Sequence, residues 1–124
     1  TCSYDVRLEP GAELWQEYRD WSVNPYLIGP SLKFADGKLY ARDKELMALP
    51  TGQWCHVEVT AKLGAGADGQ YQLTVTPPGG QPQQFSLPCV DAKWNKLTWV
   101  GFVSNATSKT AFYLDNVKLQ NLTP

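Results

Sequence analysis

Apolar and polar residues alternate along several short stretches of the chain, and turn-forming residues separate these stretches. The clearest alternation covers residues 53–63, and residues 2–9 and 70–76 alternate in the same way. Side chains of successive strand residues point to opposite faces of a sheet, so the pattern predicts half-buried β-strands. In the clearest stretch, the residues expected to face a core are Cys55, Val57, Val59, Ala61 and Leu63.

Ten glycines and nine prolines punctuate the chain. Asp36-Gly37 is suited to a two-residue hairpin turn, because both residue types accept a positive φ. Gly29-Pro30 predicts a bulge or a change of direction, since proline donates no hydrogen bond to a neighbouring strand. We expect about 9–10 strands at a spacing of roughly ten residues, which is typical of an all-β, antiparallel two-sheet β-sandwich or jelly roll.

The 124 residues suit a single β-sandwich domain over residues 1–124. Because the chain begins at Thr1 rather than Met, we expect a processed protein or, in preference, a module of a larger protein. No run of about 20 apolar residues is present. The net charge of −1 supplies no basic surface for nucleic acid or lipid. We therefore expect no nucleic-acid partner and no membrane partner. No motif points to a cofactor, and we expect none apart from a possible structural calcium.

Three cysteines occur, Cys2, Cys55 and Cys89, with one histidine, His56. They form no C-x-x-C pair, which argues against a zinc site. Their positions in the alternating stretches place all three thiols inward. One disulfide with one free thiol and three buried free thiols are both compatible with this pattern.

Two tryptophans, a tyrosine and four charged side chains fall within residues 13–21. As a strand, this stretch places Glu13, Trp15, Glu17, Arg19 and Trp21 on one face. The opposite face then holds Leu14, Gln16, Tyr18 and Asp20. Residues 11–18 also have near-helical spacing, but we favour a strand because the neighbouring stretches are extended. The alternation of residues between the two faces does not by itself show which face is buried.

Glycoside hydrolysis requires two carboxyl groups either about 5–5.5 Å or about 6.5–9.5 Å apart. Glu13 and Glu17 lie four residues apart on one strand face, which separates their Cα atoms by about 13 Å. Glu17 and Arg19 are better spaced for an ion pair or a ligand clamp. An adjacent arginine lowers the pKa of a carboxylic acid, which opposes a general-acid role. We therefore expect no enzyme activity.

Sugar binding needs flat aromatic rings and nearby hydrogen-bonding groups. Trp15, Trp21 and Tyr26 are candidates for the rings, with Glu17, Arg19 and His56 for the polar contacts. Trp54 shares a face with His56 and would join this site if both stretches lay on one concave sheet. Alternatively, His56 makes only a cross-strand hydrogen bond. Trp99 and Phe102 are expected in the core.

Four stretches, residues 49–59, 71–75, 97–104 and 112–119, resemble domains of the concanavalin A-like lectin and glucanase sandwich. Residues 17–21 and 29–32 look like a sandwich module attached to bacterial polysaccharide-degrading enzymes. The resemblance implies two curved sheets, a concave face that takes a glycan, and a secreted, periplasmic or cell-surface location. A catalytic domain of the parent protein would then be a partner.

The final stretch also resembles the galactose-binding-like jelly roll, through Tyr113-Leu-Asp-Asn-Val117. That resemblance implies a structural calcium, with Asp115 as a candidate ligand. The alternative is that Asp115 and Asn116 make ordinary hydrogen bonds at a strand edge.

Together these patterns indicate a non-catalytic carbohydrate-binding module. The alternative is a structural accessory domain that packs on a catalytic domain and binds no sugar, and a glycoside hydrolase or polysaccharide lyase fragment is less favoured. A binding module should expose two or more aromatic residues in a groove, whereas an accessory domain should bury them. The residues that decide this are Trp15, Trp21, Tyr26 and Trp54.

Overall fold

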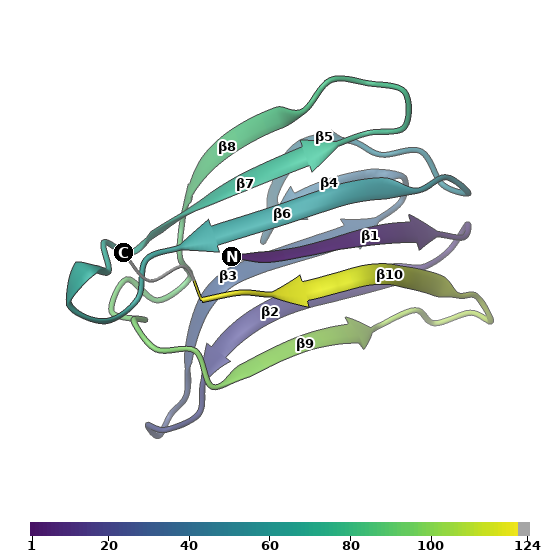
Figure 1. Cartoon of the computed structure of the whole chain (residues 1–124). Helices are drawn as coiled ribbons and strands as arrows, with labels where there is room; N and C mark the ends of the chain where they lie inside the picture. The colour runs from purple at the N-terminus through teal and green to yellow at the C-terminus, as the bar shows by residue number, and fades with distance from the viewer. Residues whose placement is uncertain (122–124) are drawn as a thin grey trace.

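A computed structural model describes residues 1–121 as two antiparallel five-stranded sheets packed face to face (Figure 1). Sheet A has the strand order β10-β1-β6-β7-β8, and sheet B has the order β5-β4-β3-β2-β9. The strands of sheet A are β1 (Cys2–Leu8), β6 (Cys55–Ala61), β7 (Gln70–Thr76), β8 (Gln83–Pro88) and β10 (Phe112–Leu119). Those of sheet B are β2 (Glu13–Asp20), β3 (Leu27–Ala35), β4 (Lys38–Ala41), β5 (Lys44–Ala48) and β9 (Trp99–Ser104). The predicted all-β sandwich is confirmed.

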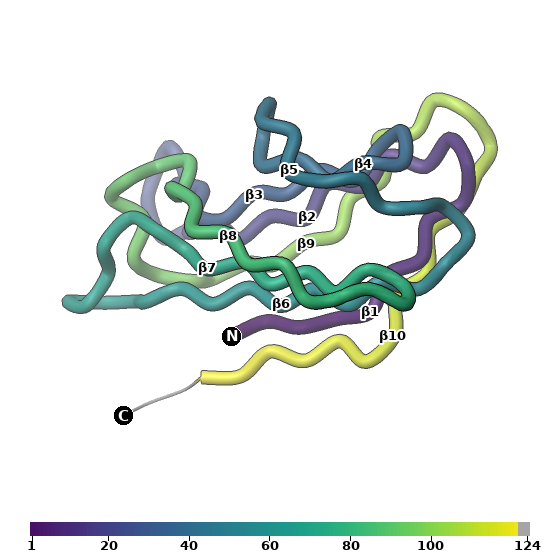
Figure 2. Tube along the Cα trace, turned by 90° about the horizontal axis from the view of Figure 1, so that it is seen from above, coloured from purple at the N-terminus to yellow at the C-terminus, as the bar shows by residue number. Residues whose placement is uncertain are grey.

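The two sheets lie as separate layers when viewed along their edges (Figure 2). Strands β2 to β5 follow one another in sheet B, and β6 to β8 do so in sheet A. The chain changes sheet after β1, β5, β8 and β9. A short 3₁₀ turn, Gly64–Gly66, connects β6 with β7. Within residues 1–121 no helix has the length and apolar character needed to cross a membrane.

The core lies between the sheets and is built by the inward positions of the alternating strands. In β1 these are Cys2, Tyr4, Val6 and Leu8, and in β7 they are Tyr71, Leu73 and Val75. In β6, Cys55, Val57 and Val59 are buried as predicted, and Ala61 packs against the core. Leu63 was expected inward but is 44% exposed. It lies beyond the last residue of β6, so the strand alternation no longer fixes its direction.

The two predicted irregularities occur where the sequence placed them. Asp36 and Gly37 have φ angles of 54° and 70°, and they close the hairpin between β3 and β4. Along β2, Glu17 pairs with Ser31 and Arg19 pairs with Ile28. Gly29 and Pro30 therefore both lie opposite one residue, which is a β-bulge.

Strand β2 places Leu14, Gln16 and Tyr18 in the interior. Its alternate residues, from Glu13 to Arg19, consequently point away from the core. Residues 13–20 thus form a strand rather than a helix. The face that carries Glu13, Trp15, Glu17 and Arg19 is the outward one.

All three cysteines are free and buried. Burial raises the pKa of Cys55 to about 11 and that of Cys89 to about 11. The predicted inward orientation of the thiols is confirmed, and the alternative with a disulfide is wrong.

Candidate functional site

The outward face of sheet B brings together aromatic and charged side chains from β2, β3, β4, β9 and the connection between β2 and β3. We call this group the aromatic face. Its members are Trp15, Glu17, Arg19, Trp21, Tyr26, Lys33, Tyr40 and Trp99, as the strand register and the contacts below establish. Five of the predicted site residues belong to it. They are Trp15, Glu17, Arg19, Trp21 and Tyr26.

Arg19 lies at the centre of one half of the aromatic face. Its guanidinium carbon is 4.4 Å from the centroid of the Trp99 ring, 5.0 Å from that of Tyr26 and 5.9 Å from that of Trp21. The rings of Trp21 and Tyr26 stack on each other with centroids 4.1 Å apart. Cation–π contacts of this kind fix the position of the rings as well as that of the cation.

Glu17 fixes the direction of the arginine. Arg19 donates from Nε at 3.0 Å and from Nη2 at 2.7 Å, both to Oε1 of Glu17. Ser31 donates to the other carboxylate oxygen, Oε2, at 2.5 Å. Glu17 is only 7% exposed although it belongs to the outward face, because neighbouring side chains cover it. The predicted ion pair is confirmed, and both carboxylate oxygens are engaged.

Trp99 was expected in the core, and this expectation is wrong. Arg19 pairs with Trp99 across β2 and β9, so the indole shares the outward face with the arginine. The ring lies over Gly101, where an added Cβ would stand 2.0 Å from Cη2 of Trp99. Glycine is therefore what allows a broad aromatic ring to lie against the strand. Phe102, the other residue expected in the core, packs edge-on against Tyr4 with centroids 5.1 Å apart.

The second half of the aromatic face is a row across three strands. Lys33 of β3 pairs with Trp15 of β2 on one side and with Tyr40 of β4 on the other. Its ammonium nitrogen is 5.6 Å from the Trp15 ring centroid and 5.2 Å from that of Tyr40. The lysine thus lies between two aromatic rings.

The indole N–H of Trp15 is directed to the β9 side of this row. It lies 3.4 Å from Oε2 of Glu13. With the amide of Asn105 oriented to satisfy its hydrogen bonds, the indole donates to the amide oxygen of Asn105 at 3.0 Å. The orientation of the Trp15 ring is therefore fixed by a hydrogen bond at its edge.

Trp54 and His56 do not join the aromatic face. His56 belongs to β6 of sheet A, whose neighbours Cys55 and Val57 are buried in the core. Its side chain therefore points away from the molecule on the side opposite to that of Trp15. Trp54 is 44% exposed next to β6. The hypothesis of one concave sheet holding both groups is wrong, because the two stretches enter different sheets.

His56 makes the cross-strand contact that was the alternative. Its Nδ1 lies 2.7 Å from Oδ1 of Asp5, and Asn116 donates from its side chain to Oδ2 of Asp5 at 2.7 Å. The hydrogen bond from Asn116 is the largest cause that lowers the pKa of Asp5, and His56 adds to it while partial burial opposes it. This network links β6, β1 and β10 on the outward face of sheet A.

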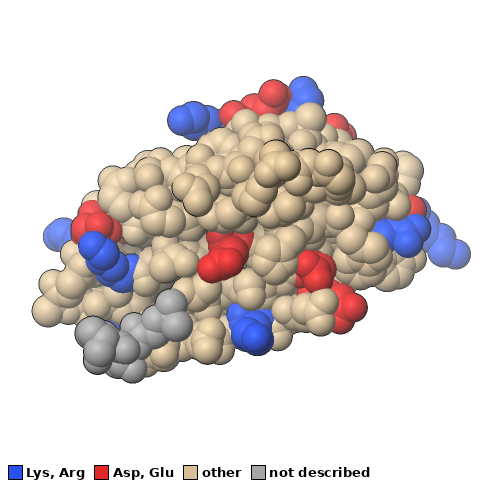
Figure 3. Space-filling model, turned by 45° about the horizontal axis from the view of Figure 1, so that its top comes forward, with Lys and Arg blue, Asp and Glu red and all other residues tan. Residues whose placement is uncertain are grey.

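The outward face of sheet A has no aromatic row comparable to that of sheet B. Its half formed by β7 and β8 shows no charged side chain, and the carboxylates lie over β6, β1 and β10 (Figure 3). The outward residues of that half are Gln70, Gln72, Thr74, Thr76, Gln84, Ser86 and Pro88. Ser86 donates to the side-chain oxygen of Gln72 at 2.8 Å. Apart from Pro88, this half of the sheet is therefore polar and uncharged.

Asp115, the candidate calcium ligand, is exposed on β10. One of its oxygens accepts a hydrogen bond from the backbone N–H of Asn116 at 2.8 Å. Among residues 1–121, no group of three or more histidine, cysteine, aspartate or glutamate side chains is placed to hold a metal ion. The geometry around Asp115 is that of a local hydrogen bond at a strand edge.

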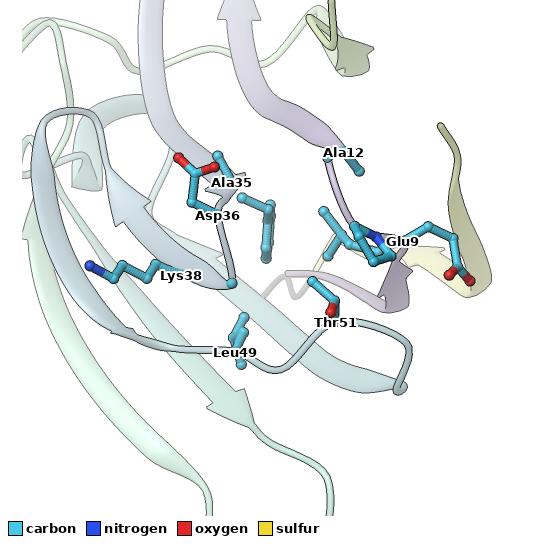
Figure 4. A pocket seen from close by; sticks show the side chains of 12 residues that line it. Glu9, Ala12, Ala35, Asp36, Lys38, Leu49 and Thr51 are labelled. Carbon is cyan, nitrogen blue, oxygen red and sulfur yellow. The ribbon is translucent and has the colours of Figure 1, made fainter. Parts of the chain in front are cut away.

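A pocket of about 300 Å³ lies at the end of the sandwich, away from the aromatic face (Figure 4). Leu8, Phe34 and Leu49 line it, and the residues at its border include Glu9, Asp36, Lys38 and Thr51. In Figure 4 the side chains of Lys38 and Glu9 point away from its centre. No sequence pattern indicated this pocket, because strand ends and loops that are distant in the sequence form it.

Sequence reasoning missed Lys33, Tyr40 and Trp99 as members of the aromatic face, and it missed Ser31 as the hydrogen-bond partner of Glu17. The Asp36-Gly37 turn contains the signal for the first two. A two-residue hairpin fixes the register, and counting back from it pairs Lys33 with Tyr40 on the same face. The pairing of β2 with β3 adds Trp15 to this row, and no local pattern indicates that pairing.

Four aromatic residues distinguish a binding module from an accessory domain, and they lie on different sides of the sandwich. Trp21 is 51% exposed, whereas Trp15 and Tyr26 are half-buried on the same face. Trp54 is exposed on the opposite side of the molecule. Two of the four residues are therefore exposed, but they do not lie in one groove, so the arrangement expected of a binding module is not met in full.

No protein family matches the sequence, and neither a curated protein nor a solved structure matches it. Function is therefore inferred from the side chains of the aromatic face.

Proposed function

We propose that this chain is a non-catalytic carbohydrate-binding module of the β-sandwich class, which binds a polysaccharide or oligosaccharide across the aromatic face of sheet B. The observation that carries the proposal is the clustering of five aromatic rings, with Arg19 and Lys33 between them, on one sheet face. Aromatic rings stack on the apolar faces of sugar rings, and the interspersed polar groups bind hydroxyls.

The length of the aromatic face favours a chain of sugars over a single sugar. Trp15 and Trp21 are six residues apart along the β2 direction, which corresponds to about 20 Å. The rings at the two ends are therefore too far apart to contact one monosaccharide. An extended glycan can contact both halves of the face at once.

Fixed side chains support binding rather than turnover. Glu17 has one carboxylate oxygen bonded to Arg19 and the other to Ser31, so neither oxygen is free to transfer a proton. Arg19 is oriented by the same contacts and by three rings. Preorganised groups lose little conformational entropy when a ligand binds. A glycoside hydrolase or polysaccharide lyase fragment is for this reason the less favoured assignment.

An accessory domain without sugar binding is the second candidate, and one surface favours it. Val117 and Leu119 on the edge strand β10 are 53% and 59% exposed, and Leu63 lies exposed in the connection after β6. Leu63 and Leu119 line a common hollow. An apolar edge of this kind suits contact with the catalytic domain of a larger protein. A carbohydrate-binding module of a secreted, periplasmic or cell-surface enzyme would also use this apolar edge to contact the catalytic domain.

Affinity electrophoresis in gels that contain soluble neutral or acidic polysaccharides tests the proposal. We expect at least one polysaccharide to retard the protein, and the double variant Trp15→Ala/Trp99→Ala to migrate as in a gel without glycan. Trp54→Ala is the matched control, because it removes an exposed indole from sheet A. If no polysaccharide retards the wild-type protein, the binding function is wrong and the accessory domain is favoured.

A further inference from the structure

We infer that the glycan recognised by the aromatic face is acidic, and that Lys33 binds its anionic group, a uronate carboxylate or a sulfate ester. This inference rests on the proposed function and adds the substrate class. It depends on the difference between the two cations of the face, of which one is neutralised by a carboxylate and the other is not.

Arg19 is the neutralised cation. Its ion pair with Glu17 has an N···O distance of 2.7 Å, and the carboxylate is nearly buried. A ligand anion would have to compete with that carboxylate for the guanidinium. Arg19 therefore serves to hold the Trp21, Tyr26 and Trp99 rings in place.

Lys33 is the cation without such a partner. The four ion pairs in the described part of the chain involve Arg7, Arg19, Lys38 and His56, and none involves Lys33. No side-chain hydrogen bond of residues 1–121 involves its ammonium group either. An ammonium carries three donors, so this group can bind an acceptor from outside the chain.

The position of Lys33 matches that role. It belongs to β3, the central strand of sheet B, and not to a loop or an edge. The Trp15 and Tyr40 rings flank its ammonium at 5.6 and 5.2 Å. A sugar ring stacked on either aromatic ring would bring its substituents to the ammonium between them. The side chain is half-buried, so salt screens its charge less than that of an exposed lysine.

The charges around Lys33 determine how an anion would approach. Lys38 on β4 is paired with Glu45 at 3.0 Å. Glu13 has no cationic partner among the described residues and lies two residues from Trp15 on β2. Its register partner on β3 is Ala35 rather than Lys33. Glu45 lies opposite Tyr40 in the register of β4 and β5, and its ion pair with Lys38 offsets its charge. An anionic group is therefore expected between Lys33 and Tyr40, away from the Glu13 carboxylate.

A neutral sugar would leave the ammonium without an ionic partner, whereas a carboxylate or a sulfate would make a charge-assisted hydrogen bond with it. Such bonds are stronger than those between neutral groups. The difference amounts to roughly tenfold or more in affinity. Acidic glycans should accordingly be preferred over neutral glycans of similar size.

The test compares dissociation constants from affinity electrophoresis in polygalacturonate, in dextran sulfate and in neutral xyloglucan. Lys33→Gln is the test variant. Lys62→Gln is the matched control, because it makes the same charge change at an exposed lysine that follows β6 on sheet A. Lys33→Arg retains the charge. Circular dichroism and urea unfolding of each variant show whether the fold is intact.

We expect the wild type to bind one of the acidic polysaccharides, Lys33→Gln to bind it about tenfold more weakly, and Lys62→Gln and Lys33→Arg to bind within about twofold of wild type. Retention only by polygalacturonate identifies a uronate, and retention only by dextran sulfate identifies a sulfate ester. Retention only by xyloglucan, or equal effects of Lys33→Gln and Lys62→Gln, overturns the inference and leaves the proposed function standing. Retention by none of the glycans overturns both.

Discussion

The indole of Trp99 lies over Gly101, at a distance that leaves no room for a Cβ atom on the glycine. Gly101 pairs with Glu17, so the ring also lies beside the buried ion pair of β2. Arg19 holds the ring at 4.4 Å. One small residue on β9 thus allows an outward tryptophan to become part of a flat aromatic surface.

Gly101→Ala is expected to displace Trp99 and to weaken glycan binding, because its Cβ would stand 2.0 Å from the ring. Trp99 is half-buried and can move into solvent, so we expect the free energy of unfolding to change by about 1 kcal/mol or less. The comparison is Gly29→Ala, whose Cβ would stand 2.4 Å from the ring of Trp94.

Trp94 is buried and cannot move in this way. Overpacking there should lower the free energy of unfolding by about 1–3 kcal/mol or more. Urea unfolding of both variants measures the difference. A larger loss in Gly101→Ala than in Gly29→Ala would contradict this account of the two tryptophans.

The Glu17–Arg19 pair is expected to show coupling in a double-mutant cycle. Glu17→Gln leaves the guanidinium without its carboxylate, and Arg19→Gln leaves a nearly buried carboxylate that only Ser31 contacts. Because the arginine side chain is still 22% exposed, we expect a coupling energy of about 1–2 kcal/mol, below that of a fully buried pair. Urea unfolding of both single variants and of the double variant measures it. Additive effects would show that the two side chains act independently.

The Asp5 network predicts a pH dependence of stability. The pKa of Asp5 is lowered from 3.8, first by Asn116 and then by His56. A carboxylate with a lowered folded pKa contributes stability that is complete above its unfolded pKa and is lost as the pH falls through the folded value. Wild-type protein should therefore lose this contribution on acidification below about pH 4.

Asn116→Gly isolates that contribution. Asn116 has a φ of 52°, which glycine adopts without strain, so the variant removes the amide hydrogen bond and otherwise adds only a pH-independent loss of stability through the more flexible unfolded chain. We expect its urea midpoint to fall less than that of wild type between about pH 6 and about pH 2.5. Equal falls in both proteins would show that the hydrogen bond does not affect the titration of Asp5.

The cysteines should be unreactive in the folded protein. Burial raises the pKa of Cys55 and Cys89 to about 11, so the thiolate fraction of each at about pH 8 is roughly one in a thousand. We expect iodoacetamide to modify neither residue in buffer and both in urea, as peptide mass spectrometry can measure. Rapid modification of Cys55 in buffer would contradict the burial of that strand.

Much of the fold could be predicted because local patterns determine it. Alternation identified the buried residues of β1, β6 and β7, and the Asp36-Gly37 turn and the Gly29-Pro30 bulge occur as expected. These features depend on neighbours along the chain. Which strands share a sheet depends on contacts between distant segments, and that is why His56 was wrongly grouped with Trp15.

Trp99 shows the same limit for the candidate site. Its apolar neighbours Val100 and Phe102 suggest a buried run, yet strand alternation places it outward. Burial preference alone does not distinguish an interior indole from one that packs on the outside of a sheet. Arg19, which makes the outward position favourable, comes from a strand some 80 residues earlier in the chain.

The indole N–H resonances of the five tryptophans provide the most direct measurement of the central claim. Three belong to the aromatic face, Trp94 lies in the core and Trp54 lies beside sheet A. On titration with the polysaccharide that retards the protein, we predict shifts of the Trp15, Trp21 and Trp99 signals in two-dimensional ¹H–¹⁵N spectra. The Trp54 and Trp94 signals should stay in place. A shift of Trp54 alone, or no shift with any glycan, would contradict sugar binding at the aromatic face.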